Sequence, residues 1–422
     1  MKDYDLAIVG GGAAGLVAAW AAAKEGARVV VLEKMEKTAR KVRISGKGRC
    51  NITNECRYDE FLSKVNTNPA FFRWAFSSFP QQAIVDLLES YGVKTVLERG
   101  SRVFPESGRA WDVATALHDA AIDAGADIHI FKEVVNIGVT NGKVTTIEFR
   151  DSEKGHAAVI SVKAIILATG GKSYPRTGST GDGYAFLEKL GHHIVTPLPS
   201  LVPLKVKQAE FSKIVGLQLR NVEVSLEVEG TTVANEFGEV EFFDNGLGGS
   251  AIIRLSRQAV LALEKGQNVG LTLDLKSALA NEQLVQRIRR DVKSGEFATT
   301  EELLMGLLPK KLVKPFAAFH KIGLKKPMAD LTDADISKLA RTLKSTRINV
   351  GETAGFDGAI VTMGGVSLKN IDPKTMQSKL VKGLYVAGEL LDLDGPTGGY
   401  NLQIAFSTGY LAGKSAAKGL NE

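Results

Sequence analysis

Cysteine is nearly absent from this chain of 422 residues, which has only Cys50 and Cys56. Two cysteines cannot make a disulfide framework or a four-cysteine metal site. Their low number fits the reducing cytoplasm, where we expect the protein to act. We find no spacing typical of a metal site and no Ser-His-Asp order typical of a hydrolase, so we expect neither.

Long apolar runs are also lacking. Residues 6–23 carry no charge, but a membrane helix needs about 20 apolar residues, and three glycines at 10–12 interrupt this segment. Asp3 and Asp5 precede it, whereas a signal peptide starts with basic residues. We therefore expect a strand, a turn and a helix here, and no membrane contact.

A strong excess of one charge is lacking as well. The chain has 53 Lys and Arg against 47 Asp and Glu, a net charge of +6. This mild excess does not argue for nucleic acid, and we expect none as a partner. The hydrophobic fraction of 44% and the charged fraction of 24% are those of a globular protein, which argues against disorder, collagen and coiled coil.

Glycine, by contrast, is abundant, with 44 residues, or about one in ten against an average nearer 7%. The glycines have no three-residue period, and they gather in clusters. Such clusters indicate backbone that turns tightly against another group. Several follow predicted strands, where a ligand can approach the backbone.

The hydrophobic pattern predicts an α/β fold with a Rossmann-like domain. Residues 4–9 form a short apolar strand, residues 15–24 an alanine-rich helix and residues 27–32 a β-branched strand. This unit of about 30 residues has the size of a dinucleotide-binding strand–helix–strand unit. Further along, we expect one helix at 68–91 and one strand at 159–169 that ends in two glycines.

The middle of the chain has a different pattern. Residues 201–241 alternate short strands with polar turns, which predicts an antiparallel sheet or barrel, and residues 281–344 predict several helices. We therefore expect residues 1–195 and 351–422 to form one nucleotide-binding domain. A β-barrel-like and helical substrate subdomain at 196–350 interrupts it.

The first chemical motif is G-x-G-x-x-G, between the first strand and helix. Gly10 permits the tight turn, Gly12 lets the backbone approach a pyrophosphate, and Gly15 lets helix and strand pack closely. Ala14 lies in the same helix start, whose free N–H groups attract phosphate. Glu33, at the end of the second strand, can accept hydrogen bonds from ribose hydroxyls. The alternative is a glycine turn in a nonbinding domain, but the strand, the helix and the acid together favour dinucleotide binding.

The second motif is a loop rich in basic residues, namely Lys34, Lys37, Arg40, Lys41, Arg43, Lys47 and Arg49. A bound pyrophosphate needs positive charge and backbone donors, and this loop offers both. From it we assign to the cofactor site Lys34, Lys41, Arg43, Ser45, Gly46, Gly48, Arg49, Cys50 and Asn51. The alternatives are an exposed basic loop and, for the Cys50 thiol, a buried small hydrophobe.

Two further motifs follow strands. Ala168-Thr169-Gly170-Gly171 predicts backbone close to the cofactor, with a plain crossover between domains as the alternative. Gly388-Glu389 ends a strand at 384–387, and Gly398-Gly399-Tyr400-Asn401-Leu402 leads into a last helix at 402–413. The acid can hold a polyol chain, and the helix N-terminus can stabilise negative charge on a reduced flavin ring. The alternative is an ordinary helix cap.

These four motifs, in this order, resemble a family of bacterial FAD-dependent oxidoreductases. The family includes flavoproteins described as aminoacetone oxidases and as a bile-acid (dienone steroid) reductase. The resemblance covers nearly the whole chain and is most specific at residues 45–51, 168–171, 361–366 and 388–403. It implies a flavin domain of the two-dinucleotide-binding-fold type with an inserted β-barrel and helical subdomain. It also implies an adenine contact from the backbone of Val134 or Val135, and FAD contacts at Gly10, Gly12, Gly15, Glu33, Arg43, Ser45, Gly48, Asn51, Gly388, Asn401 and Leu402.

One segment departs from the family pattern. The family often has Phe-Thr-His and a glycine, then Ser-Gly-Pro and a helix, whereas residues 241–250 read Glu-Phe-Phe-Asp-Asn-Gly-Leu-Gly-Gly-Ser. The threonine, histidine and proline are absent. If this loop faces the flavin, substrate preference or the proton donor differs from that of relatives.

Because flavin performs the redox chemistry, the protein has to orient the substrate and supply a proton. Tyr174 and Arg176, just after the glycine pair, can reach an oxyanion or a carbonyl, and Tyr400 lies beside the last glycines. These three are our catalytic candidates. The alternative for each is a structural role.

We expect an FAD enzyme that passes a hydride between a small organic or steroid-like substrate and either NAD(P)H or oxygen. The first partner would make it a reductase of the C=C bond of an enone, and the second an amine oxidase that forms hydrogen peroxide. Only one G-x-G-x-x-G is present, so NAD(P)H would visit without its own Rossmann unit. The alternative of another class is a flavin- or nucleotide-binding protein that modifies RNA or senses redox state.

Overall fold

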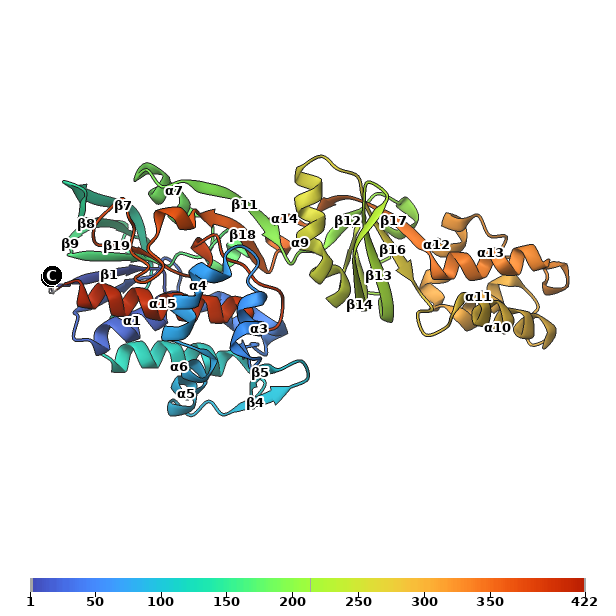
Figure 1. Ribbon diagram of the computed structural model, residues 1–422, viewed down its shortest axis with the longest axis horizontal. Helices are drawn as coiled ribbons and strands as arrows, with labels where there is room; N and C mark the ends of the chain where they lie inside the picture. The colour runs from blue at the N-terminus through green and yellow to red at the C-terminus, as the bar shows by residue number, and fades with distance from the viewer. Residues whose placement is uncertain (1–2, 213, 421–422) are drawn as a thin grey trace. The chain divides into compact units, whose positions relative to one another are not determined.

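A computed structural model describes residues 3–212 and 214–420, and the chain divides into two compact units. The first unit runs to Leu198 and resumes at Ile360, so both ends of the chain build it, as the blue and red segments in Figure 1 show. The second unit, Pro199–Ala359, is the insertion, for which the sequence predicts limits of 196 and 350.

A parallel sheet of five strands forms the centre of the first unit, in the order β19-β10-β1-β2-β6. The strands are β1 (Leu6–Val9), β2 (Val29–Leu32), β6 (Asp127–His129), β10 (Ala164–Leu167) and β19 (Leu384–Val386). Apolar side chains occupy both faces, so β1, β2, β10 and β19 are buried along their whole length. The strands run in one direction, and their carboxyl ends therefore meet at one edge.

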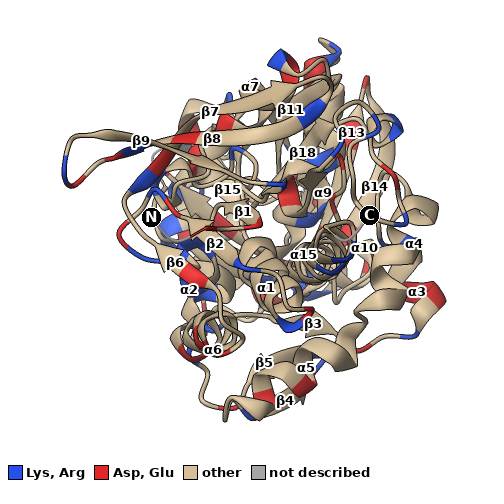
Figure 2. Ribbon diagram, turned by 90° about the vertical axis from the view of Figure 1, so that its left-hand side faces the viewer, with Lys and Arg blue, Asp and Glu red and all other residues tan. Residues whose placement is uncertain are grey.

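Three helices of the first unit cover one side of this sheet: α1 (Ala13–Lys24), α6 (Ala110–Asp123) and α15 (Tyr400–Lys418). α1 and α15 lie side by side in Figures 1 and 2 because two glycines of α15 let the backbones touch. A Cβ on Gly409 would lie 2.3 Å from the Ala14 carbonyl oxygen, and one on Gly413 would lie 2.2 Å from that of Ala18. Across the described residues, no helix is both long and apolar enough to cross a membrane.

An antiparallel sheet on the opposite side consists of β7 (Lys132–Thr140), β8 (Lys143–Asp151) and β9 (Ala157–Ser161). β9 and β10 belong to different sheets, so the prediction of one strand at 159–169 is wrong. The backbone changes partner between two residues: the Val162 N–H donates to Thr145, and the Lys163 N–H donates to Asp5. The apolar run continues through residues 159–169, so the sequence pattern does not predict that the hydrogen-bond partner changes within it.

Residues 68–91 form two helices rather than the single helix that the pattern predicts: α4 (Pro69–Ser78) and α5 (Gln81–Ser90). The break falls at Phe79-Pro80. A proline disfavours helical backbone in the residue before it, and Phe79 has φ −146° and ψ 80°. The apolar periodicity continues across the break, which is why it suggested one helix.

The remaining elements before and after the insertion are short: α2 (Arg40–Ile44), β3 (Thr53–Asn54), α3 (Tyr58–Ser63), β4 (Thr95–Glu98), β5 (Arg102–Pro105), α7 (Asp182–Lys189), β11 (Ile194–Ser200) and β18 (Val361–Val366).

The second unit contains a closed barrel of six strands, in the order β12-β15-β14-β13-β16-β17. They are β12 (Leu204–Val206), β13 (Gln218–Val228), β14 (Thr231–Phe243), β15 (Gly246–Gly248), β16 (Val269–Asp274) and β17 (Thr346–Thr353). Alternate residues of β13 are buried, among them Val222, Val224 and Leu226, as expected of a strand with one face in a core. α9 (Ser250–Glu264) packs against β13 and β14. The predicted barrel is therefore confirmed.

Four helices between β16 and β17 complete the insertion: α10 (Asn281–Lys293), α11 (Thr300–Leu307), α12 (Lys310–His320) and α13 (Asp333–Lys344). Their Leu, Ile and Phe side chains share one apolar core with the barrel. Thr332 caps α13, because its hydroxyl oxygen accepts the Asp335 N–H at 3.2 Å. Two single turns, α8 (Ala209–Ser212) and α14 (Gly355–Gly358), flank the barrel strands in sequence. The fold class is the predicted one, a Rossmann-like α/β domain with an inserted barrel and helical subdomain.

Candidate functional site

The first and third glycine motifs meet at the carboxyl ends of β1 and β10. Gly10 has φ +98°, and a Cβ on it would lie 2.6 Å from the Ala168 carbonyl oxygen and 3.2 Å from the Thr169 Cα. A Cβ on Gly15 would lie 1.9 Å from the Gly10 carbonyl oxygen. These two glycines are therefore required by the turn and by the close packing of α1 on β1.

Gly12 differs from these two glycines, because nothing in the described structure requires glycine at this position. Its φ of −83° and ψ of −168° suit any residue, and a Cβ there would meet no described atom within 4 Å. It lies at the N-terminus of α1, where the first N–H groups have no partner inside the helix. The protein's own structure does not need glycine here, so the open space fits a group from outside the chain that approaches the backbone, such as a phosphate.

The fourth motif reaches the same helix start from the far end of the sequence. Gly388 follows β19 with φ +75°, and a Cβ on it would lie 2.9 Å from the Ala14 Cβ. Its N–H donates to the Thr408 hydroxyl at 2.9 Å. Ala14, near the start of the chain, thus packs closely against Gly388, near its end.

Glu33 is held at the end of β2 by two backbone donors. The Gly11 N–H donates to its Oε2 at 2.8 Å, and the Met35 N–H donates to its Oε1 at 2.8 Å. Burial raises the pKa of Glu33, although both N–H groups and two nearby cations oppose the shift. The carboxylate keeps further lone pairs that can accept ribose hydroxyls.

The seven cations of the second motif do not all turn toward these glycines. Lys34 forms an ion pair with Asp182 and donates to the Thr180 hydroxyl at 2.7 Å. Arg49 forms an ion pair with Glu98. These two predicted cofactor residues are engaged by carboxylates from distant segments.

Arg43 retains an unused donor. Its guanidinium lies 3.9 Å above the Trp111 ring, and its Nε donates to the Thr38 carbonyl oxygen at 3.2 Å. Its Nη1 is buried and has no hydrogen-bond partner within the described part of the chain. A buried donor without a partner is unfavourable, so this nitrogen fits an acceptor supplied by a ligand.

Lys41 joins the second, third and fourth motifs. Its Nζ lies 2.7 Å from Glu389 Oε2 and donates to the Ser173 hydroxyl at 2.9 Å. Ser173 donates to Glu389 Oε1 at 2.5 Å, and the Thr362 N–H donates to the same oxygen at 2.8 Å. Gly170 lies beside this group, because a Cβ on it would be 3.9 Å from Lys41 Nζ.

The pKa of Glu389 results from opposing effects. Burial raises it, but the Lys41 charge and the hydrogen bonds from Lys41, Ser173 and Thr362 together hold the pKa below its ordinary value. Glu389 is therefore a carboxylate at neutral pH. Nothing in the sequence identifies Ser173 or Thr362 as its partners, although Ser173 follows the third motif and Thr362 lies in the segment 361–366.

Asn51 connects the basic loop to the turn before α15. In the amide orientation that satisfies both groups, its oxygen accepts the Gly399 N–H at 3.2 Å and its nitrogen donates to the Thr53 carbonyl oxygen at 3.1 Å. Gly399 has φ +96°, and a Cβ there would lie 2.3 Å from the Thr53 carbonyl carbon. The Asn401 amide closes the preceding turn through two bonds to Gly395. These contacts fix the start of α15, with the partly buried Leu402 in its first turn.

Cys50 and its neighbours shape the loop from inside. The Cys50 thiol is fully buried, and burial raises its pKa to about 12, so it is no nucleophile at neutral pH. The Ser45 hydroxyl donates to the Val42 carbonyl oxygen at 2.8 Å. Gly46 and Gly48 have φ of +57° and +84°, left-handed values that favour glycine.

The two predicted adenine contacts lie at a β-bulge. β7 begins beside β2, because the Lys132 N–H donates to the Glu33 carbonyl oxygen at 2.8 Å. In the pairing of β7 with β8, Val134 is opposite Phe149 and Asn136 is opposite Glu148. Val135 between them therefore has no partner residue on β8. A bulge leaves backbone groups available for other partners.

The three catalytic candidates have different surroundings. The Tyr400 ring packs 4.8 Å from Phe61, and its hydroxyl lies 3.8 Å from the Cys56 sulfur, so its polar end is occupied within an aromatic cluster. Tyr174 is half-buried with φ 50°, and burial raises the pKa of its phenol. Arg176 is exposed. Among the described residues, the side chains of Tyr174 and Arg176 have no hydrogen-bond or ion-pair partner.

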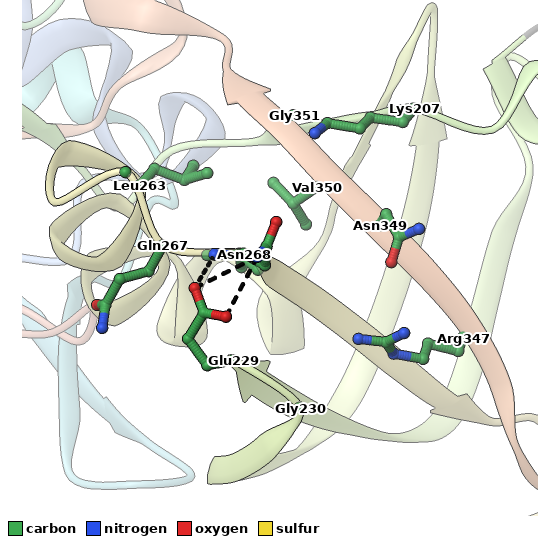
Figure 3. A pocket seen from close by; sticks show the side chains of 12 residues that line it. Lys207, Glu229, Gly230, Leu263, Gln267, Asn268, Arg347, Asn349, Val350 and Gly351 are labelled. Atoms are coloured by element: carbon green, nitrogen blue, oxygen red, sulfur yellow. Dashed lines mark hydrogen bonds between the residues drawn. The ribbon is translucent and has the colours of Figure 1, made fainter.

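A polar hollow of about 580 Å³ lies in the second unit, along β16 and β17 (Figure 3). The Glu229 carboxylate in it points toward Asn268 and accepts that residue's backbone N–H at 2.7 Å. This bond and those from the Asn268 side chain lower the pKa of Glu229, so it is not a proton donor at neutral pH. Arg347 pairs with Glu227 at 2.7 Å. None of the predicted site residues lines this hollow.

The segment that departs from the family pattern forms a hairpin of the barrel. Asp244 and Asn245 connect β14 to β15, and Asn245 has φ 56°, as tight turns require. The Asn245 amide donates to the Asp244 carboxylate at 3.2 Å. The departure therefore changes a turn of the second unit.

The comparisons with known proteins bear on these motifs as a set. A family model described as HI0933-like protein Rossmann domain matches residues 4–415. The chain belongs to the HI0933-like family. A 3-dehydro-bile acid delta(4,6)-reductase of Clostridium scindens is 32% identical, over 98% of this chain and 99% of that protein. A ribosomal RNA dihydrouridine synthase of Haemophilus influenzae is 29% identical, over 97% of this chain and 98% of that protein.

A solved structure shows the same fold at low identity. The 3-ketosteroid delta1-dehydrogenase of Sterolibacterium denitrificans matches with a TM-score of 0.55 at 13% identity, over 99% of this chain and 100% of that chain. Membership of the HI0933-like family confirms the resemblance stated from the motifs. The protein is an FAD-dependent oxidoreductase with a Rossmann-type flavin domain.

Proposed function

We propose that this protein saturates a carbon–carbon double bond conjugated with a carbonyl group, with NAD(P)H as the electron donor. The observation that carries the proposal is that two relatives matching over nearly their full length bear names for such reactions. Dihydrouridine is uridine with a saturated C5–C6 bond, and in uracil that bond is conjugated with a ring carbonyl. A 3-keto steroid with double bonds at positions 4 and 6 has the same conjugation.

We assign the adenosine half of FAD to the residues at the ends of β1, β2 and β7. The open N-terminus of α1 at Gly12 suits the pyrophosphate, and the unpaired Arg43 Nη1 supplies a further donor for a phosphate oxygen. Glu33 suits the ribose hydroxyls, and the bulge at Val135 suits the adenine edge.

We assign the flavin half of FAD to Glu389 with Lys41 and to the N-terminus of α15. Glu389, ionised and held by Lys41, suits the hydroxyls of the polyol chain. The N-terminus of α15, fixed through Gly399, carries the positive end of a helix dipole and suits negative charge on the ring. FAD, when bound, supplies the capacity for hydride transfer.

The protein's own contribution to the chemistry is to position the substrate and to supply one proton. NAD(P)H is oxidised to NAD(P)⁺ and provides the hydride that reaches the alkene carbon far from the carbonyl; the neighbouring carbon takes a proton. Tyr174 holds a proton on its phenol at neutral pH, as a phenol ordinarily does, and burial raises its pKa further. Its phenol is the proton donor in our proposal, and solvent restores the proton. Arg176 suits the carbonyl oxygen of the substrate.

Two half-reactions, followed separately without oxygen, test the proposal. NADH or NADPH should bleach the flavin band at about 450 nm, and a steroid dienone or a uridine-containing RNA should restore it. We expect Tyr174→Phe to slow the second step by about 10²- to 10⁴-fold and to leave the first unchanged. Tyr410→Phe, which keeps the ring that stacks on Phe79, serves as the matched control.

An oxidase would behave differently. If NAD(P)H does not bleach the flavin while an amine does, and oxygen then restores the band with formation of hydrogen peroxide, the reductase proposal fails. Equal rates of both half-reactions in Tyr174→Phe and wild type would remove Tyr174 from the mechanism and leave the reaction class intact.

A further inference from the structure

The mild net charge of the chain conceals two regions of opposite sign in the second unit. Residues 281–344, which contain α10 to α13, have 13 Lys and Arg against 8 Asp and Glu. The rest of this unit, residues 199–280 and 345–359, has 9 Lys and Arg against 12 Asp and Glu. A basic helical part therefore accompanies an acidic barrel, and the whole-chain value averages them.

Several cations of the helical part are neutralised locally. Arg289 lies 3.0 Å from Asp333, Lys326 lies 2.7 Å from Asp335, and Lys344 lies 2.5 Å from the barrel residue Asp274. Five exposed lysines of α12 and of the loop after it differ from these, since none has an ion-pair partner among the carboxylates that the structure describes. We call them the α12 lysines: Lys310, Lys311, Lys314, Lys321 and Lys325.

Lys310, Lys311 and Lys314 lie on the solvent side of α12, whose other side is buried, and Lys321 and Lys325 follow the helix. Lys310 and Lys314 are four residues apart and therefore share one side of the helix. Leu312, Val313 and Phe316 are buried in the core of the unit. Lys310, Lys311 and Lys314 span about 6 Å of α12, at 1.5 Å per residue, and Lys321 follows its last residue.

Another cation, Lys338 on α13, lies near His320, the last residue of α12. Burial and then the charge of Lys338 lower the pKa of His320 to about 4. His320 stays neutral at physiological pH, so it does not add to the charge. Among the described residues of α12 and of the loop after it, 310–327, no large hydrophobic side chain is exposed, and the exposed Met305 lies on the preceding helix α11. A helix that inserts into a membrane surface needs large apolar residues beside its lysines, and this one lacks them.

We propose that the α12 lysines bind the phosphate backbone of RNA. The proposal rests on the proposed function, because the uracil ring of an RNA is a substrate of the required kind. Uncompensated lysines on a helix that exposes no large apolar side chain match a phosphate chain in charge and chemistry. The ribosomal RNA dihydrouridine synthase that matches 97% of this chain supports RNA as the polyanion. Net charge alone argued against such a partner because it sums opposite regions.

The salt dependence of binding is the sharpest measurement. We use the FAD-loaded full chain and a fluorescein-labelled RNA hairpin with uridines in its loop, and follow anisotropy between 50 and 200 mM KCl. If all five lysines contact phosphates, log K should fall with log salt with a slope of about −4, which is a loss of about 250-fold over this range. Replacing Lys310, Lys311 and Lys314 by alanine should reduce the slope by about two to three.

The triple variant keeps α12 intact, because alanine is the best helix former. The matched control replaces three exposed lysines of the first unit, Lys94, Lys143 and Lys189, and changes the net charge equally. Equal losses in both variants, or no binding by wild type, would overturn the proposal. Binding to phosphatidylglycerol vesicles without binding to RNA would overturn it too.

Reduction of a steroid dienone separates the two proposals. The α12 lysines should not affect it, so the triple variant should match wild type. If the triple variant loses RNA but keeps dienone reduction, both proposals stand. If RNA binds through α12 and neither the dienone nor the RNA is reduced, the binding surface stands and the proposed function fails.

Discussion

Replacing Gly12 by alanine separates what the fold needs from what the cofactor needs. The Gly12 backbone has φ −83° and ψ −168°, and a Cβ there would meet no described atom within 4 Å. We expect the Gly12→Ala apoprotein to unfold with a free energy within about 1 kcal/mol of wild type. Alanine is a poorer N-cap than glycine, but it lowers the entropy of the unfolded chain, and the two effects oppose each other.

FAD affinity should fall, by contrast. The new methyl group would occupy the open space at the N-terminus of α1 and would keep the pyrophosphate from the backbone N–H groups. A hydrogen bond to a charged group contributes about 1.5–3 kcal/mol. The loss of one such bond would raise the Kd for FAD by about tenfold to a hundredfold.

Titration of apoprotein with FAD, followed by quenching of flavin fluorescence, measures the affinity, and circular dichroism on heating measures the stability. Gly323→Ala is the neutral control, because its nearest atom to a Cβ is 4.0 Å away and its backbone is not left-handed. Gly15→Ala is the opposite control: its Cβ would lie 1.9 Å from the Gly10 oxygen, so the apoprotein itself should be destabilised. Wild-type affinity in a well-folded Gly12→Ala protein would refute the assignment of the pyrophosphate to this helix.

Two further predictions concern buried groups of the same unit. Glu389→Gln should reduce the free energy of unfolding by about 1–3 kcal/mol at pH 7, because it leaves Lys41 partly buried without its anion. Folding lowers the pKa of Glu389. The stabilisation is therefore complete above the pKa of the unfolded chain, about 4.5, and is lost as the pH falls through the pKa of the folded protein. The urea unfolding curves of variant and wild type should accordingly converge in acid. Cys50, with its pKa raised to about 12, should resist iodoacetamide at pH 8 until urea unfolds the chain, as mass spectrometry of the peptides would show. Rapid labelling of native Cys50 would contradict its burial.

The sequence identifies the first motif well because that motif is local. Gly10, Gly12 and Gly15 stand within one strand–turn–helix unit, and the short-range rules of strands, turns and helices determine their geometry. The break between α4 and α5 at Pro80 and the change of sheet at Val162 were missed for the converse reason. At both places the apolar pattern continues while the hydrogen-bond partners change, and periodicity does not report partners.

The residues that join the site were decided by tertiary structure. Lys41 meets Glu389, 348 positions away, and Asn51 meets the turn at Gly399. The same tertiary packing draws Lys34 and Arg49 to carboxylates of other segments. An ion pair depends on which side chains the fold brings within a few ångströms, and spacing along the chain does not encode that. Composition and local motifs thus indicated the class of cofactor and of fold, while long-range contacts decided which of the many cations and glycines come together at the ends of the central strands.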